Sequence, residues 1–170
     1  MKITEPKVEY RDAQHYMGIR TQVTMKEMSE GVIPQSIDEV FAWLREHGVA
    51  QAGPPLMRLH VINMEAKMDI EVGWPVANVL EGDDRVRPSV LPAGRYASLI
   101  YTGVKNAMEG NKALLDWGAE KGLVWDRWDV DADDAFASRF ESFLTGPVDD
   151  PDPDKWDTEV AIKLADDQAR

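Results

Sequence analysis

The chain has 170 residues, of which 44% are hydrophobic and 29% charged, a composition typical of a globular protein that buries a core. Its 31 acidic residues against 19 lysines and arginines give a net charge of −12, which argues against general binding to nucleic acids or anionic membranes. The absence of cysteine excludes disulfides, thiolate metal sites and cysteine nucleophiles.

The N-terminal sequence does not resemble a secretory signal. The stretch MKITEPKVEYRD has no apolar run of signal-peptide length, and nowhere do about 18 apolar residues follow one another. We therefore expect a cytoplasmic protein without a membrane span.

The first predicted strand is followed by an amphipathic helix. Residues 14–23 mix apolar and β-favouring side chains as a strand does. Thr24-Met-Lys-Glu27 and Ser36-Ile-Asp-Glu39 both fit a capping box, in which a hydroxyl and a carboxylate satisfy each other's backbone amides. The second box predicts the start of the longer helix, and Gly48 predicts its end.

Two further strands complete the first half of the chain. They are predicted at residues 56–62 and 68–76, on either side of a short polar turn. The segment 78–88, NVLEGDDRVRP, is polar and rich in turn-forming residues. It predicts a boundary between two halves.

The second half repeats the order of elements. A strand, a helix closed by Gly122 and then further strands are predicted. Their ranges are residues 94–102, about 105–121, 123–130, 136–144 and 158–164.

A weak internal repeat relates the halves. Trp43-Leu-Arg-Glu-His-Gly48-Val49 aligns with Trp117-Gly-Ala-Glu-Lys-Gly122-Leu123, and Ile70-Glu71-Val72 aligns with Phe140-Glu141-Ser142. One such unit leaves its sheet incomplete, so we expect two units to join. The predicted fold is α+β: two pseudo-symmetric βαββ repeats forming one antiparallel sheet, with helices on one face and a ligand groove between the halves.

The strand predicted at residues 136–144 carries a carboxylate at its centre. Because strand side chains alternate, the even-numbered residues share one face and Arg139, Glu141 and Phe143 share the other. We assign the even-numbered set to the helix-covered face, which places Glu141 on the open face. Periodicity alone favours a simpler interpretation, an ion pair with Arg139 or exposure at a sheet edge.

Aromatic residues are numerous, with six tryptophans in the chain. Trp43 and Trp117 repeat on the predicted helices and suit packing, whereas aromatic residues on strands can form the walls of a flat pocket together with Glu141 and Glu71. Such a pocket suits a lipophilic cation, which both ring faces and a poorly solvated carboxylate attract. The aromatic candidates are Trp74, Tyr96, Tyr101, Trp125, Trp128 and Phe143.

Other kinds of site have little support. His15, His47 and His60 lack metal-ligand spacing, and no glycine-rich phosphate loop or nucleophile elbow occurs. The sequence predicts no metal and no cofactor.

Two segments resemble a known family. Arg139-Phe-Glu141-Ser-Phe143-Leu-Thr145-Gly-Pro147, followed by Asp152-Pro153-Asp-Lys-Trp156-Asp-Thr158-Glu159-Val160, resembles the C-terminal signature of GyrI-like small-molecule-binding domains, the effector-binding domains of bacterial transcription activators. Leu91-Pro-Ala-Gly94-Arg-Tyr96-Ala97 with Gly103 resembles the start of the family's second repeat. The resemblance implies a single domain over residues 1–170, with repeats at about 8–80 and 90–165.

The resemblance also implies a pocket with an acidic residue at its centre, on the strand that Glu141 occupies. It implies the standalone form of the domain, since fewer than ten residues precede the first repeat and leave no room for a DNA-binding module. The expected ligand-binding residues are Glu141, Phe143, Trp74, Tyr96, Tyr101, Trp128, Glu71 and Arg139.

Three functions follow as hypotheses. The first is non-catalytic binding of an aromatic, lipophilic or cationic small molecule. The second is hydrolysis of reactive cyclopropane-bearing natural products, with Glu141 as general base and Tyr101 or Tyr96 as proton donor. The third is binding of the acidic surface to a protein partner, a regulator or gyrase. The sequence specifies neither the ligand nor the oligomeric state.

Overall fold

One curled antiparallel sheet organises the chain, and the computed structural model describes residues 2–166 of it. Its strand order is β1-β7-β11-β10-β4-β5-β3-β6. Strand β2 also pairs with β7, and β9 of the β8–β9 hairpin pairs with the C-terminal end of β4. The strands are β1 Lys2–Ile3, β2 Lys7–Arg11, β3 Gln14–Val23, β4 Leu56–Ile62, β5 Met68–Pro75, β6 Arg87–Leu91, β7 Gly94–Thr102, β8 Arg127–Val130, β9 Asp133–Phe136, β10 Arg139–Phe143 and β11 Asp157–Lys163.

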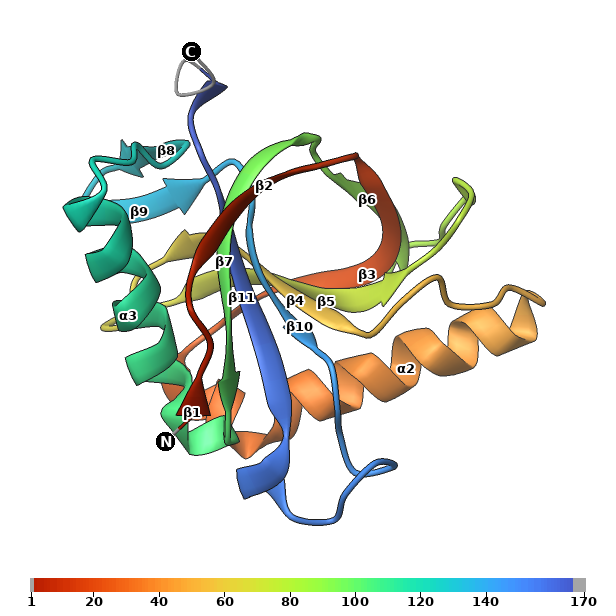
Figure 1. The fold of residues 1–170 in the computed structure, drawn as a ribbon. Coiled ribbons are helices and arrows are strands. Elements are labelled where there is room, and N and C mark those ends of the chain that lie inside the picture. The colour runs from red at the N-terminus through yellow and green to blue at the C-terminus, as the bar shows by residue number, and fades with distance from the viewer. Residues whose placement is uncertain (1, 167–170) are drawn as a thin grey trace.

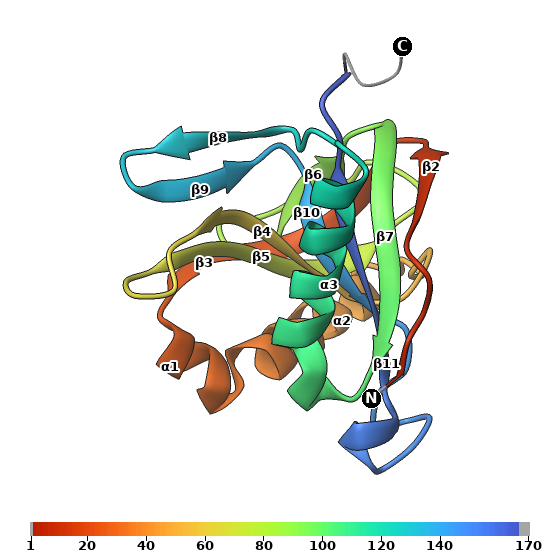
Figure 2. The same cartoon turned by 60° about the vertical axis from the view of Figure 1, so that its left-hand side comes forward.

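Two long helices cover the convex face of this sheet (Figures 1 and 2). Helix α2 packs on β3 and β5, and helix α3 packs on β7 and β11. The helical segments are α1 Met25–Glu27, η1 Met28–Val32, α2 Ile33–Glu46, η2 Val104–Asn106, α3 Ala107–Glu120 and η3 Pro153–Lys155.

The order of elements confirms the predicted α+β fold with two βαββ repeats. The first repeat is β3-α2-β4-β5, and the second is β7-α3-β10-β11 with the β8–β9 hairpin inserted after the helix. The repeats join where β4 pairs with β10, and there Met57 lies opposite Glu141. The pseudo-twofold axis therefore passes close to Glu141.

The short strands that precede each repeat are exchanged. Strand β2 comes before the first repeat but pairs with β7 of the second, and β6 comes before the second repeat but pairs with β3 of the first. Figure 1 shows both short strands completing the curl of the sheet. Their sequences, KVEYR and RPSVL, are polar for strands, and they were not among the predicted elements.

Both long helices end in the same way, as the aligned sequences predict. After α2, the Val49 amide donates to the Leu44 carbonyl at 2.9 Å and the Gly48 amide to Arg45 at 3.2 Å. After α3, Leu123 donates to Gly118 and Gly122 to Ala119 at the same two distances. Gly48 and Gly122 each have φ +68°, the left-handed conformation that a Schellman motif needs.

Three local predictions are wrong. The strand predicted at residues 123–130 begins only at Arg127. The capping box at Thr24 and Glu27 forms, but Ser36 is buried inside α2, because the helix already begins at Ile33 with Pro34 in its first turn. The predicted strand at 136–144 is broken between β9 and β10, where the Ser138 hydroxyl accepts a hydrogen bond from Tyr96 instead of continuing the alternation.

The core is divided between the two faces of the sheet. Clusters under α2 and α3 fill the convex face, and a smaller cluster lines the concave face. A hollow of about 360 Å³ opens on the concave face over Leu56 and Phe140, beside the seam between the repeats. Among residues 2–166 no helix is long and apolar enough to cross a membrane.

Candidate ligand site

Glu141 lies on β10 at the seam between the repeats, beneath the helices. Its carboxylate oxygen Oε1 accepts a hydrogen bond from the Tyr101 hydroxyl of β7, and the residue is only 6% exposed. Tyr101 in turn lies against α3, where Gly110 leaves room for its ring: a Cβ at Gly110 would be 2.5 Å from the Tyr101 Cδ1 atom. The tyrosine thus holds the carboxylate at a fixed place under α3.

The charges around Glu141 are unevenly compensated. Arg139, on the same face of β10, donates from Nη2 to Asn111 Oδ1 of α3 at 2.9 Å, and its buried Nε has no hydrogen-bond partner. Burial raises the pKa of Glu141 above its usual range, and the hydrogen bond from Tyr101 and the charge of Arg139 offset this only in part. Burial and the nearby carboxylate raise the pKa of the Tyr101 hydroxyl, so Tyr101 remains a hydrogen-bond donor.

The assignment of faces on β10 was reversed. Arg139 and Glu141 face α3, whereas Phe140 lies in the concave-face cluster with Tyr96. The alternation itself is correct along residues 139–143. The break at Ser138 explains the reversal. Before the break, the even-numbered Phe136 packs under α3; after it, the odd-numbered residues face that helix.

Two further predicted residues lie on the same convex face as Glu141. Phe143 packs against the apolar cluster beneath the start of α2. Trp74 of β5 donates from Nε1 to the Ile37 carbonyl of α2 at 2.9 Å, and its ring lies 5.5 Å from that of Phe41. The convex face therefore carries five of the predicted residues, namely Glu141, Tyr101, Arg139, Phe143 and Trp74.

The other three predicted residues lie elsewhere. The Tyr96 hydroxyl is on the concave side, where it donates to Ser138 Oγ at 2.8 Å or to the Pro92 carbonyl at 2.7 Å. Trp128 is 51% exposed on the β8–β9 hairpin. Glu71 is buried on the concave side of β5.

Glu71 is not the counterpart of Glu141 in the repeat, contrary to the sequence alignment. In the sheet, Val72 of β5 pairs with Met57 and Val160 of β11 pairs with Glu141. Because Met57 and Glu141 face each other at the pseudo-twofold axis, Glu71 corresponds to Glu159 of β11. The short sequence alignment is misleading because it matches β5, the last strand of the first repeat, with β10, the middle strand of the second.

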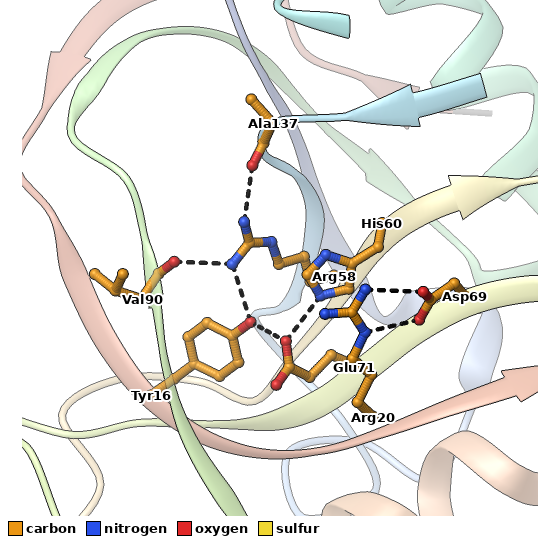
Figure 3. Close-up of polar contacts among 8 residues, drawn as sticks. All are labelled: Tyr16, Arg20, Arg58, His60, Asp69, Glu71, Val90 and Ala137. Carbon is orange, nitrogen blue, oxygen red and sulfur yellow. Dashed lines mark hydrogen bonds and ion pairs between the residues drawn. The ribbon is translucent and has the colours of Figure 1, made fainter. Parts of the chain in front are cut away.

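A second buried tyrosine–glutamate pair occupies the concave face (Figure 3). The Tyr16 hydroxyl donates to Glu71 Oε1, and His60 Nε2 lies 2.8 Å from the same oxygen. Arg58 Nη1 donates to the Tyr16 hydroxyl at 3.2 Å. Arg58 itself is fixed by the carbonyls of Val90 and Ala137, both at 2.8 Å.

Sequence reasoning missed Tyr16, Arg58 and His60 as partners of Glu71. The available signal was the spacing of Arg58 and His60, two polar residues on one face of the otherwise apolar strand LMRLHVI. Burial acts to raise the pKa of Glu71, but the hydrogen bonds with His60 and Tyr16 and the charge of Arg58 outweigh it and hold the pKa below its usual range. Glu71 is therefore an ionised carboxylate at neutral pH.

The two βαββ repeats joined in one antiparallel sheet define a class of protein, the two-repeat α+β domains. Residues 4–165 match the model of the GyrI-like small molecule binding domain. The chain belongs to this family. A search of curated protein sequences found no significant match.

Solved structures with the same fold differ widely in sequence. The C-terminal domain of EcmrR has a TM-score of 0.75 at 16% identity, with 95% of this chain and 97% of that one covered. SAV2435 bound to tetraphenylphosphonium has a TM-score of 0.62 at 11% identity, with 98% of both chains covered. A hydrolase from Listeria innocua has a TM-score of 0.63 at 11% identity, with 95% and 92% covered. This chain spans 57% of the EcmrR chain in its DNA complex.

Proposed function

We propose that the protein binds bulky lipophilic cations at Glu141, on the convex face between α2 and α3. The observation that carries this proposal is a carboxylate at the seam of the repeats, buried to 6% exposure and poorly compensated by its neighbours. A carboxylate in such surroundings attracts a cation that can shed its water easily, because both partners lose little hydration when they meet.

The surrounding side chains favour a ligand with aromatic or apolar substituents. Phe143 and Trp74 lie on the same face, and each packs against an apolar cluster next to α2. Because Glu141 is enclosed, a ligand reaches it only when the side chains packed around it move apart. SAV2435, which shares the fold, has a solved structure bound to tetraphenylphosphonium, and this supports the choice of that cation as a probe.

A titration with tetraphenylphosphonium tests the proposal. We expect saturable quenching of tryptophan fluorescence by the wild type, and binding at least about tenfold weaker in Glu141→Gln, which keeps the shape but loses the charge. Asp116→Asn, an exposed carboxylate of α3 paired with Lys112, is the matched control and should bind normally. Tetraphenylborate, an anion of the same shape, should not bind.

The pH dependence of that binding has a definite sign. A bound cation stabilises the ionised form of Glu141, whose pKa burial raises. Affinity should therefore increase as the pH rises through the pKa of Glu141, with protons released on binding. Equal affinity of the wild type and Glu141→Gln at all pH values would refute the role of Glu141.

A hydrolase is the second candidate function, favoured by the direct hydrogen bond between Tyr101 and Glu141. Glu141, with its raised pKa, can accept the proton of a water molecule that attacks a strained ring, and the protonated Tyr101 can donate to the opened ring. A hydrolase from Listeria innocua has the same fold. Product formation from a cyclopropane-bearing electrophile by the wild type but not by Glu141→Gln would support this activity.

A further inference from the structure

The buried cluster around Glu71 has an unused hydrogen-bond acceptor. Both the Tyr16 hydroxyl and His60 Nε2 contact Oε1 of Glu71. Among the hydrogen bonds made by residues 2–166, none ends on Oε2. Glu71 is ionised and only 5% exposed, but Oε2 is not among the side-chain atoms that are buried without a partner. This oxygen is therefore open to solvent and can accept a hydrogen bond from a ligand.

A cleft of about 370 Å³ lies beside this carboxylate, at the start of β6, where β3 continues past Gly18 without a β6 partner. Its volume falls in the range of small-ligand sites. Polar groups dominate its lining, which makes it unlike the apolar surroundings of Glu141. The residues that line it are Ile19, Arg20, Glu71, Asp84, Arg85, Arg87, Pro88 and Ser89.

Three arginines line the cleft, and two of them are already paired. Arg20 donates to Asp69 at 2.8 and 3.0 Å, and Arg85 donates from Nη2 to Glu39 at 3.0 Å. Within residues 2–166, Arg87 has no carboxylate partner, and its hydrogen bond to the Asp83 carbonyl is long, at 3.4 Å. In a chain of net charge −12, this arginine is an available cation at the cleft.

We propose that this cleft is a second ligand site, which takes a small zwitterion whose ammonium group donates to Glu71 Oε2 and whose carboxylate meets Arg87. The site lies on the opposite face of the sheet from Glu141 and does not depend on the function proposed there. Its two charged ends complement the two groups of the ligand, so each end of the ligand contributes a charge-assisted hydrogen bond. A lipophilic cation of the kind proposed for Glu141 lacks both features.

The rigidity of the cluster suits such a site. Tyr16 and His60 fix Oε1, and Gly18 gives the Glu71 side chain room, since a Cβ at Gly18 would lie 3.2 Å from Glu71 Cγ. Arg58, anchored by two carbonyls, keeps Tyr16 in place. A binding group held in one orientation loses little entropy when its ligand arrives.

The experiment uses a series of ω-amino acids from glycine to 6-aminohexanoate, because their length varies while their end groups stay the same. Binding is followed by the backbone amide chemical shifts of the full chain at up to about 10 mM ligand. We expect one chain length to bind best, with the largest shifts at Gly18, Glu71 and Arg87. Butylamine and butanoate, which carry one end group each, should bind at least about tenfold more weakly than that best length.

Variants separate this site from its alternatives. Glu71→Gln and Arg87→Gln should each weaken binding at least about tenfold. Arg87 is exposed, so Arg87→Gln still tests the proposal if Glu71→Gln, a substitution of a buried residue, impairs folding. Arg45→Gln, on the exposed side of α2, is the control and should bind normally. The proposal is overturned if no amino acid of the series gives saturable shifts, or if binding is the same in wild type and Arg87→Gln.

Discussion

Two buried tyrosine–glutamate pairs lie on opposite faces of one sheet, and the pKa values of their carboxylates are shifted in opposite directions. Tyr16 donates to Glu71 on the concave face, and Tyr101 donates to Glu141 on the convex face. Both carboxylates are more than nine-tenths buried. Yet the pKa of Glu71 is lowered and that of Glu141 is raised.

The difference lies in the second partner of each carboxylate. Glu71 gains a hydrogen bond with His60 and the charge of Arg58 in addition to its tyrosine. Glu141 has Tyr101 and the charge of Arg139, whose Nη2 donates to Asn111. The hydrogen bond from Tyr101 and the charge of Arg139 are thus too little to offset the burial of Glu141. A tyrosine, a histidine and an arginine together are sufficient for Glu71.

The largest effect is expected from Glu71→Gln. Removing the charge leaves the buried Arg58 guanidinium without its compensating anion, so the free energy of unfolding should fall by about 3 kcal/mol at neutral pH. Because the folded-state pKa of Glu71 is lowered, the stabilisation is present above the unfolded-state pKa and is lost as the pH falls through the folded-state value. Urea unfolding at several pH values should show that the difference in free energy of unfolding between the wild type and Glu71→Gln disappears in acid. The control Asp116→Asn should show no comparable difference at any pH.

An intermediate effect is expected from Gly110→Ala, which acts on the convex pair alone. A Cβ at this position would lie 2.5 Å from Cδ1 and 2.9 Å from Cγ of Tyr101. We expect overpacking to lower the free energy of unfolding by about 3 kcal/mol. The better helix propensity of alanine restores about 1 kcal/mol, so the net decrease is about 2 kcal/mol. Thermal unfolding checks this, with Glu109→Ala on the exposed side of α3 as control; an unchanged melting temperature would show that the contact is not tight.

The smallest effect, of opposite sign, is expected from Glu141→Gln. Since the folded-state pKa of Glu141 is raised, its contribution to stability is greatest below the unfolded-state pKa and is lost as the pH rises through the folded-state value. The variant should be more stable than the wild type by about 1 kcal/mol at pH 8 and equal to it at about pH 4. Destabilisation at pH 8 would mean that Glu141 is compensated as well as Glu71 is, and the contrast between the pairs would fail.

The sequence predicts the repeated elements because their signals are local. Gly48 and Gly122 mark the two helix ends, and the strand at residues 14–23 has its observed bounds. Strand β6 escapes prediction because an edge strand needs little apolar surface and can accommodate Pro88. Such a strand is defined by its partner and not by its own composition.

The site is less predictable than the fold because it depends on which faces meet. The sequence singles out Glu141 and Tyr101, but the break at Ser138 reverses the face on which they lie. The partners of Glu71 come from β3 and β4, and only the register of the sheet brings Tyr16 and His60 to one oxygen. No local pattern carries that information.

The pairing of β4 with β10 has a consequence for how the chain is made. Strand β4 ends at Ile62, whereas its neighbour β10 begins only at Arg139, so the inner edge of the first repeat has no partner until most of the protein has been synthesised. Strand β2 likewise waits for β7. Contacts between such distant segments slow folding and leave strand edges open to wrong partners on the ribosome. The seam that positions Glu141 therefore cannot form before β10 has been synthesised, and we expect it to form late in folding.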